Sequence, residues 1–372
     1  MAMAQKVDPQ RGRSVEKAAT VDIGQPDAFS AFDDGRVLPF PESEVGEGMP
    51  EGPAVSPEKA LVKVFGGNCG HRDRTLSDKK SLSGRARGKP VRPPVFVLSG
   101  GAARGVAHLG FLAAAEKAGI RPKAIVGTSA GALMGALYLS SDCTTAGPWA
   151  RVRKTGYGQI LRFAFSRRGI FSSLRLTELI GESLEKKTFE ELPVPFHATV
   201  TNWTVRSLEL LSSGELASAV AASCALPPLF TPVRRGESDY LDGGVLSILP
   251  AMAARRIYPK DTLIAVDVNV RSPRPLSESR RKEKKRDENW LSMAIGPLWL
   301  SIARASLLER SFADDTLPIP AGDYPLFSLS SIEKIYELGY HEGTAFWNRK
   351  DMWERLSGDG PEDSRGDVRG RP

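Results

Sequence analysis

The stretch Ala124-Ile125-Val126-Gly127-Thr128-Ser129-Ala130-Gly131 decides the fold of this chain. Its first three residues are apolar, as in a buried parallel strand, and a helix of small residues is predicted from Ala130 to Ser140. This strand-turn-helix order is typical of a nucleophile elbow, whose turn must be built from small residues. Gly127 and Gly131 meet that demand on either side of Ser129. The alternative interpretation is an ordinary turn in which a Ser or Thr caps the helix.

A second glycine turn, Ser99-Gly100-Gly101-Ala102-Ala103-Arg104-Gly105, lies between the apolar run 95–98 and a predicted helix that ends at Gly119. A dinucleotide-binding turn would look similar, but it needs an acidic residue at the end of the next strand. No Asp or Glu occurs between Glu116 and Asp142. We therefore expect the backbone N–H groups of this turn to form an oxyanion hole beside the serine.

These two units place strand, helix, strand and helix within about fifty residues, which predicts an α/β fold. The remaining pattern predicts strands at 196–202, 207–211 and 263–268. It predicts helices at 174–187, 216–223, 290–310 and 332–347.

A third element, Tyr240-Leu241-Asp242-Gly243-Gly244, is a strand end followed by two glycines. Carboxylates at strand ends are often catalytic in α/β folds, although an Asp-Gly turn is common in itself. A Ser-His-Asp triad in the usual α/β order would need a histidine after the acid, and only His341 qualifies. The other histidines lie in the leader (His71), a predicted helix (His108) and a predicted strand (His197). The residues alone leave a dyad and a triad both open.

The charge distribution argues against nucleic acid as a partner. The chain of 372 residues has 51 Lys and Arg against 44 Asp and Glu, a formal charge of +7. Residues 71–92 hold 8 basic and 2 acidic side chains, and residues 271–288 hold 8 and 4, so the rest of the chain is close to neutral. We expect the basic segment 71–92 to make peripheral contact with an anionic membrane. The basic run within 271–288 is either a solvated loop or a further contact with anionic lipid.

The composition also predicts the domain organisation. Residues 1–92 read as a disordered leader that is basic at 71–92, residues 93–348 as one catalytic domain with a charged loop at 271–288, and residues 349–372 as a polar tail. We expect no signal peptide and no transmembrane segment, because no apolar run reaches the required length. Three widely spaced cysteines fit a reducing compartment, so a cytoplasmic location is expected.

In this order, the three elements resemble the patatin-like phospholipase family, whose serine hydrolases use a Ser-Asp dyad. The resemblance runs from about Val95 to Gly343. Besides the three elements it includes Ala222-Ser223-Cys224-Ala225-Leu226-Pro227, Leu249-Pro250 and Glu337-Leu338-Gly339-Tyr340. It implies a three-layer α/β/α sandwich with a mostly parallel central sheet.

The resemblance also implies roles for individual residues. Ser129 would be the nucleophile and Asp242 the general base, while the N–H groups of Gly101 and Ala102 would hold the oxyanion. The residues expected to support these groups are Gly100, Arg104 and Gly105 in the oxyanion loop, Gly127 and Gly131 in the elbow, and Gly243 and Gly244 after the base. Ala102 departs from the family, which usually has a glycine there, and an alanine disfavours a positive φ.

The implied reaction is hydrolysis of an acyl ester of a phospholipid or lysophospholipid through an acyl-enzyme. No metal or other cofactor is expected, since the sequence has neither an EF-hand loop nor a His-Glu-x-x-His motif. Two alternatives remain: an acyltransferase that uses the same acyl-enzyme, and a regulatory protein that keeps the fold with weak catalysis.

Overall fold

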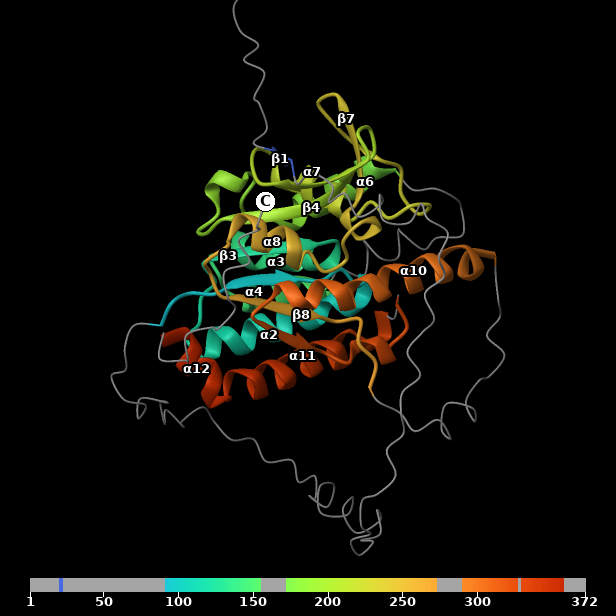
Figure 1. Ribbon diagram of the computed structural model, residues 1–372. Coiled ribbons are helices and arrows are strands. Elements are labelled where there is room, and N and C mark those ends of the chain that lie inside the picture. The colour runs from blue at the N-terminus through green and yellow to red at the C-terminus, as the bar shows by residue number, and fades with distance from the viewer. Residues whose placement is uncertain (1–19, 23–90, 155–171, 273–289, 327–328, 358–372) are drawn as a thin grey trace, which may run out of the picture. The chain divides into compact units, whose positions relative to one another are not determined.

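The computed structural model describes residues 20–22, 91–154, 172–272, 290–326 and 329–357 (Figure 1). Their strands are β1 (Thr20–Asp22), β2 (Val95–Leu98), β3 (Ala124–Thr128), β4 (Phe196–Asn202), β5 (Ser207–Leu211), β6 (Val233–Arg235), β7 (Ser238–Asp242), β8 (Leu263–Asp267) and β9 (Asp315–Pro318). Their α-helices are α2 (Val106–Lys117), α3 (Ala130–Ser140), α4 (Ala146–Lys154), α6 (Ser173–Ser183), α7 (Leu216–Ser223), α8 (Ala251–Ile257), α10 (Trp290–Glu309), α11 (Ile332–Trp347) and α12 (Lys350–Ser357). Short 3-10 turns are η2 (Ala102–Gly105), η3 (Phe189–Glu191), η4 (Gly243–Val245), η5 (Arg310–Phe312), η6 (Ala321–Asp323) and η7 (Leu329–Ser331).

The described strands form one mixed sheet in which five adjacent strands are parallel. The sheet order is β1-β5-β4-β3-β2-β8-β9, with β7 paired to β4 and β6 paired to β7. Strands β4, β3, β2, β8 and β9 run parallel, and the other pairings are antiparallel. The carboxyl ends of β2, β3 and β8 therefore meet at one edge, where open α/β sheets bind their ligands.

Helices cover both faces of the sheet, which confirms the expected α/β/α layering. Side chains alternate between the two faces of a strand, so Phe96 and Leu98 of β2 pack into one core with α2, α3 and α11. Val95 and Val97 pack into the other core with residues of α8 and with Ile302 of α10. Because both faces are covered, β2 is apolar at every position, as the sequence pattern predicted.

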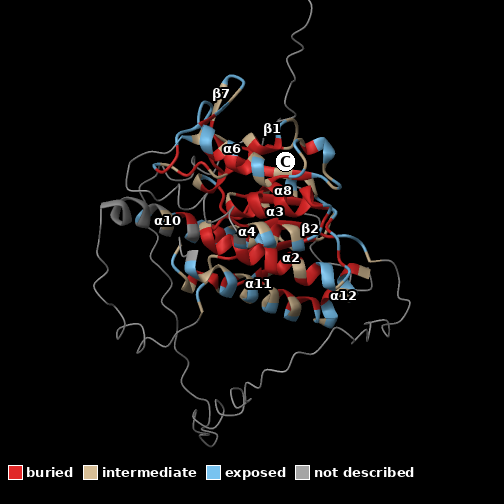
Figure 2. Cartoon of the chain, turned by 180° about the vertical axis from the view of Figure 1, so that it is seen from behind, coloured by how far each residue is buried: buried red, intermediate tan, exposed pale blue. Residues whose placement is uncertain are grey.

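Helices α2 and α11 lie side by side in both views (Figure 1, Figure 2) and pack unusually closely. A Cβ atom on Gly110 would lie 2.1 Å from the Tyr336 carbonyl oxygen, and one on Gly339 would lie 2.0 Å from that of Ala107. Only glycine at both positions permits this approach. The contact fixes α2, whose first turn continues the glycine turn after β2.

The structure differs from the sequence expectations at both ends of the chain. Within the expected disordered leader, β1 pairs antiparallel with β5 and covers the backbone of what would be an edge strand. Within the expected polar tail, α12 is a helix that buries Met352 and Leu356, four residues apart on one face. The rest of the leader up to residue 90, residues 273–288 of the charged loop, and the tail from 358 lie outside the described residues.

Candidate active site

Ser129 occupies a sharp turn between β3 and α3. Its backbone has φ 52° and ψ −119°, a conformation that costs an L-residue on the order of 1–3 kcal/mol and is held here by its surroundings. A Cβ atom on Gly131 would lie 2.4 Å from the Leu98 carbonyl oxygen, so a larger residue cannot follow the turn. The predicted elbow geometry is therefore present.

Asp242 reaches Ser129 because of the strand register. On β4, Thr199 pairs with Thr128 of β3 and the next residue, Val200, pairs with Asp242 of β7. The end of β7 is thereby placed beside the end of β3. The Ser129 hydroxyl donates to Oδ2 of Asp242 at 2.7 Å.

The surroundings of Asp242 hold the carboxyl in place and change its acidity. Its Oδ1 accepts the N–H of Gly244 at 2.7 Å, and its side chain is almost fully buried. Burial raises the pKa of Asp242 to about 7, although the hydrogen bonds from Ser129 and Gly244 act in the opposite direction. A carboxyl with such a pKa can accept a serine proton and return it at neutral pH.

The glycine turn after β2 lies against Ser129. A Cβ atom on Gly100 would lie 3.2 Å from Cβ of Ser129, and one on Gly105 would lie 2.3 Å from that of Ala130. The Gly100 N–H donates to the Ile248 carbonyl at 2.8 Å. The turn and the serine are thus held together by close packing as well as by the sheet.

Ala102 has the positive φ that an alanine disfavours, at the position where the resembling family usually has a glycine. Its φ is 47°, in the left-handed region that favours glycine. The loop is anchored just after it, where the N–H of Ala103 donates to the Leu326 carbonyl at 3.0 Å and Nε of Arg104 donates to the Tyr324 carbonyl at 3.0 Å. Arg104 therefore joins the loop to η6.

Sequence reasoning missed the role of Ser223, which was noted only as part of a family segment. Its buried hydroxyl accepts the Ser129 N–H at 2.8 Å and donates to the Thr199 carbonyl at 2.7 Å. Ser223 therefore joins the Ser129 backbone to β4. Nothing in the local sequence signals this, because the bonded residues are far apart in the chain.

Cys224 also lies beside Ser129 and Asp242. Burial raises the pKa of the Cys224 thiol well above its ordinary value, and the nearby charge of Asp242 adds to the effect. The thiol therefore stays protonated and is a poor nucleophile.

A buried polar cluster at the end of β8 links α10 to the glycine turn. Asp267 is fully buried, and its Oδ2 accepts from Nη2 of Arg310 at 2.6 Å and from the hydroxyl of Ser306 at 3.2 Å. Its Oδ1 accepts the N–H of Asn269 at 2.9 Å. The Asn269 amide in turn donates to the Gly100 carbonyl at 2.9 Å, so the cluster orients the turn.

The structure does not bring a histidine to Ser129 among the described residues. His341 is exposed on α11 and faces Glu342 at 3.5 Å. His108 is buried and bonded to the Ser99 carbonyl at 2.8 Å, and burial lowers its pKa to about 4. His197 bonds to the Tyr258 hydroxyl at 2.9 Å. His71 lies outside the described residues.

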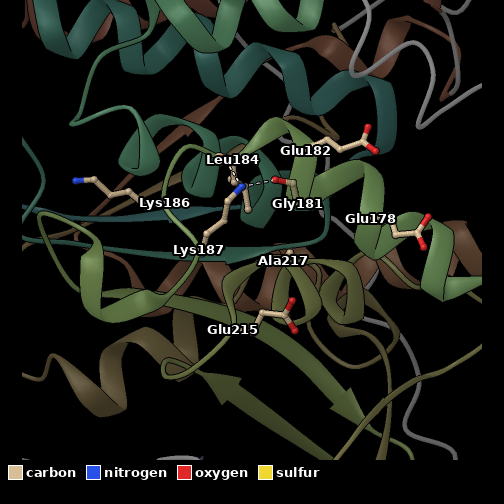
Figure 3. Close-up of a pocket in the computed structure, with 8 residues that line it drawn as sticks. All are labelled: Glu178, Gly181, Glu182, Leu184, Lys186, Lys187, Glu215 and Ala217. Atoms are coloured by element: carbon tan, nitrogen blue, oxygen red, sulfur yellow. Dashed lines mark hydrogen bonds between the residues drawn. The ribbon is translucent and has the colours of Figure 1, made fainter.

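One open pocket, of about 500 Å³, lies between α6 and α7 and is separate from the dyad (Figure 3). Nζ of Lys187 donates there to the carbonyls of Gly181 and Leu184, at 2.7 and 2.8 Å. These bonds cap α6, which explains why the helix ends at Ser183 and not at residue 187 as predicted.

The described residues contain no group of three or more His, Cys, Asp or Glu side chains placed to hold a metal ion. Among the helices in these parts of the chain, none combines the length and the apolar character that crossing a bilayer requires.

Comparison with known proteins identifies the domain. The family model for patatin-like phospholipase matches residues 96–255. Patatin-like phospholipase domain-containing protein 6 of Homo sapiens is 27% identical over 73% of this chain and 22% of its own length. Lysophospholipase nte1 of Emericella nidulans is 28% identical over 72% of this chain and 18% of its own length.

A shorter relative and a solved structure complete the comparison. An uncharacterized NTE family protein of Mycobacterium bovis is 28% identical over 61% of this chain and 63% of its own. VipD from Legionella pneumophila aligns with 70% of this chain and 67% of its own, at 16% identity and a TM-score of 0.40. The chain spans only about a fifth of the length of the first relatives, 22% for the human protein. Residues 96–255, which hold both Ser129 and Asp242, therefore match the family model for patatin-like phospholipase.

Proposed function

We propose that this protein hydrolyses acyl esters of phospholipids or lysophospholipids, with Ser129 as nucleophile and Asp242 as general base. The observation that carries the proposal is the 2.7 Å hydrogen bond from the Ser129 hydroxyl to a buried carboxyl whose pKa is raised to about 7. A serine is a weak nucleophile until an adjacent base takes its proton, and Asp242 is the group in contact with it that can do so.

The proposed cycle has two halves that balance. In the first, Asp242 takes the Ser129 proton while Oγ attacks the ester carbonyl, and the N–H groups of Gly101 and Ala102 stabilise the oxyanion. The C–O bond to the alcohol or lysolipid breaks, and the leaving oxygen takes the proton from Asp242. In the second half, Asp242 accepts a proton from water while the water oxygen attacks the acyl carbonyl carbon. The bond between Ser129 Oγ and the acyl carbon then breaks and releases the fatty acid, and Asp242 returns the proton to Ser129 Oγ.

Lipid as the substrate class is supported by the relatives, whose names include patatin-like phospholipase and lysophospholipase. Peripheral contact with an anionic membrane and a cytoplasmic location belong to the same proposal, and nucleic acid is not expected to bind. The basic segment expected to assist membrane contact, 71–92, and the basic loop 271–288 lie mostly outside the described residues.

The test is a lipid panel with products identified by mass spectrometry. The wild type is expected to release fatty acid from at least one phospholipid or lysophospholipid, and Ser129→Ala is expected to release none above background. Ser183→Ala is the matched control, because Ser183 lies on α6 and bonds only to the Leu179 carbonyl among the described contacts. A Ser129→Ala variant as active as the wild type would overturn the proposal. An added acceptor alcohol reveals whether acyl transfer competes with hydrolysis.

A further inference from the structure

Two β-turns are joined side by side beyond the dyad. The turn Trp203–Arg206 connects β4 to β5, and the turn of the β6–β7 hairpin lies next to it, projecting from the sheet (Figure 1). The N–H of Trp203 donates to the Asp239 carbonyl at 2.8 Å, and the N–H of Asp239 donates to the Thr204 hydroxyl at 3.0 Å. We call residues 203–206 and 234–239 together the hairpin tip.

Much of the hairpin tip is exposed (Figure 2), and it carries both apolar and cationic residues. Trp203 is 46% exposed and Val205 is 60% exposed. The guanidinium of Arg206 lies over the Trp203 ring, 3.3 Å from its centre. A cation in this position is attracted to the face of the aromatic ring. The tip therefore has an apolar surface bordered by a positive charge.

Two arginine side chains are exposed beside the apolar residues of the hairpin tip, Arg206 and Arg234. The guanidinium of Arg235 lies instead at the start of α7, where it donates to the Glu215 carbonyl at 2.9 Å. The carboxylate of Asp239 is paired with Arg234 at 3.2 Å, on the exposed surface. The tip thus offers the Arg206 guanidinium to an anionic group such as a lipid phosphate, next to its apolar side chains.

The tip lies on the side of the sheet where substrate must arrive. Strand β7 runs from the tip to Asp242. Within it, Asp239 lies opposite Trp203 and three residues before Asp242. At 3.3 Å per residue this places the tip roughly 10 Å beyond the dyad. A surface bound by the tip would therefore lie close to Ser129.

We propose that the hairpin tip docks on a lipid bilayer that contains anionic headgroups. Trp203 and Val205 enter the boundary between headgroups and acyl chains, and Arg206 and Arg234 contact lipid phosphates. Tryptophan prefers this boundary, and arginine can keep its charge in the headgroups while its stem lies lower. The proposal rests on the proposed function, because a lipid hydrolase has to reach esters held in a bilayer.

The first experiment measures binding of the full chain to phosphatidylcholine–phosphatidylserine vesicles by co-sedimentation, in a Ser129→Ala background that prevents hydrolysis. Loss of the two apolar side chains in Trp203→Ala/Val205→Ser is expected to weaken binding about tenfold or more. Leu308→Ser is the matched control, because Leu308 is 76% exposed on α10 outside the tip, and its binding is expected to stay within about twofold. Arg206→Gln is expected to weaken binding to anionic vesicles and to reduce its dependence on salt.

A second experiment keeps Ser129 and compares two substrates. The double variant is expected to hydrolyse a soluble short-chain nitrophenyl ester at the parent rate, while its hydrolysis of phospholipid in vesicles falls by the factor measured for binding. If the parent hydrolyses no ester, the proposed function fails, and the vesicle experiment still judges the docking surface on its own.

Two results would overturn the docking proposal. One is unchanged vesicle binding by the folded double variant and by Arg206→Gln. The other is a loss of self-association in sedimentation velocity with vesicle binding intact, which would assign the tip to a second copy of the chain instead of a bilayer.

Discussion

The hydroxyl of Ser129 lies 2.7 Å from Oδ2 of Asp242, although the two residues are 113 positions apart in the chain. Strand β4 brings the two residues together, because the ends of β3 and β7 pair with consecutive residues on the same side of β4. The sheet register, and not a flexible loop, therefore sets the distance between nucleophile and base.

Activity is expected to rise with pH through about 7 and then to level off. The base must be ionised to accept the Ser129 proton, and burial raises the pKa of Asp242 to about 7. Asp242→Asn is expected to lower kcat by at least about 100-fold and to remove this ionisation from the profile. The measurement is kcat against pH for a soluble ester. An Asn variant that keeps the rate and the profile would make another group the base.

The same pKa predicts an effect on stability. An unfolded Asp has a pKa near 3.9, so between about pH 4 and pH 7 the folded protein holds a proton that the unfolded chain has released. The burial of Asp242 therefore lowers the free energy of unfolding progressively as the pH rises through that window. Asp242→Asn is expected to be more stable than the wild type at pH 8, by up to about 4 kcal/mol, and to lose this advantage near pH 4. Denaturant unfolding at both pH values tests the sign.

Much of the fold was predictable because it follows from the local spacing of apolar residues. The continuous apolar run at 95–98 and the helical spacing at 332–347 gave strands and helices with the observed bounds. The short strand β1 was missed because its only partner, β5, lies almost two hundred residues away. Helix α12 was missed because its few apolar residues, Met352, Trp353 and Leu356, lie in a short segment rich in charged residues.

The site was predictable where a residue's role follows from its own turn. Ser129 and the glycine turn after β2 belong to that kind. Ser223 and Asn269 do not, because each acts through a backbone group brought to it by the tertiary fold. A hydroxyl or amide side chain in such a position has no local signature.

Ser223→Ala is expected to slow the reaction of the serine. It leaves the Ser129 N–H and the Thr199 carbonyl without the hydroxyl that now joins them, at a cost of about 1–3 kcal/mol in unfolding free energy. The rate of labelling by a fluorophosphonate should fall while the label still reaches Ser129. Ser140→Ala is the control, because Ser140 is equally buried and bonds only within its own helix region, to Leu137. Equal labelling rates for the two variants would deny Ser223 a positioning role.

Ala102→Gly is expected to leave stability unchanged or to raise it by up to about 1 kcal/mol, because glycine removes the strain of φ 47° while gaining entropy in the unfolded chain. Ala113→Gly, the same change at an ordinary helical position of α2, is expected to cost about 1 kcal/mol. Thermal and denaturant unfolding of both variants provide the comparison. Similar losses in both would show that Ala102 is unstrained in solution.

Removing the cation of the Asp267–Arg310 ion pair is expected to lower the free energy of unfolding more than removing the cation of an exposed ion pair. Arg310→Met leaves the Asp267 carboxylate buried without its cation, which is expected to cost about 3–5 kcal/mol of unfolding free energy. Adding Asp267→Asn to that variant should recover part of the loss. Arg175→Met, which removes an exposed partner of Glu178, is expected to change the free energy of unfolding far less than Arg310→Met does. Equal costs at the two sites would mean that Asp267 is solvated.

The most direct test of the Ser129–Asp242 assignment is covalent labelling of the full chain with a fluorophosphonate, followed by peptide mapping. The expected result is a single modified peptide with the phosphonate on Ser129, and no labelling of Ser129→Ala. The labelling rate of the wild type should rise between pH 6 and pH 8, because the pKa of Asp242 is raised to about 7. Asp242→Asn should be labelled slowly, at a rate that does not change over this pH range. Labelling of Ser129→Ala at the wild-type rate, or modification of a different residue in the wild type, would contradict the assignment.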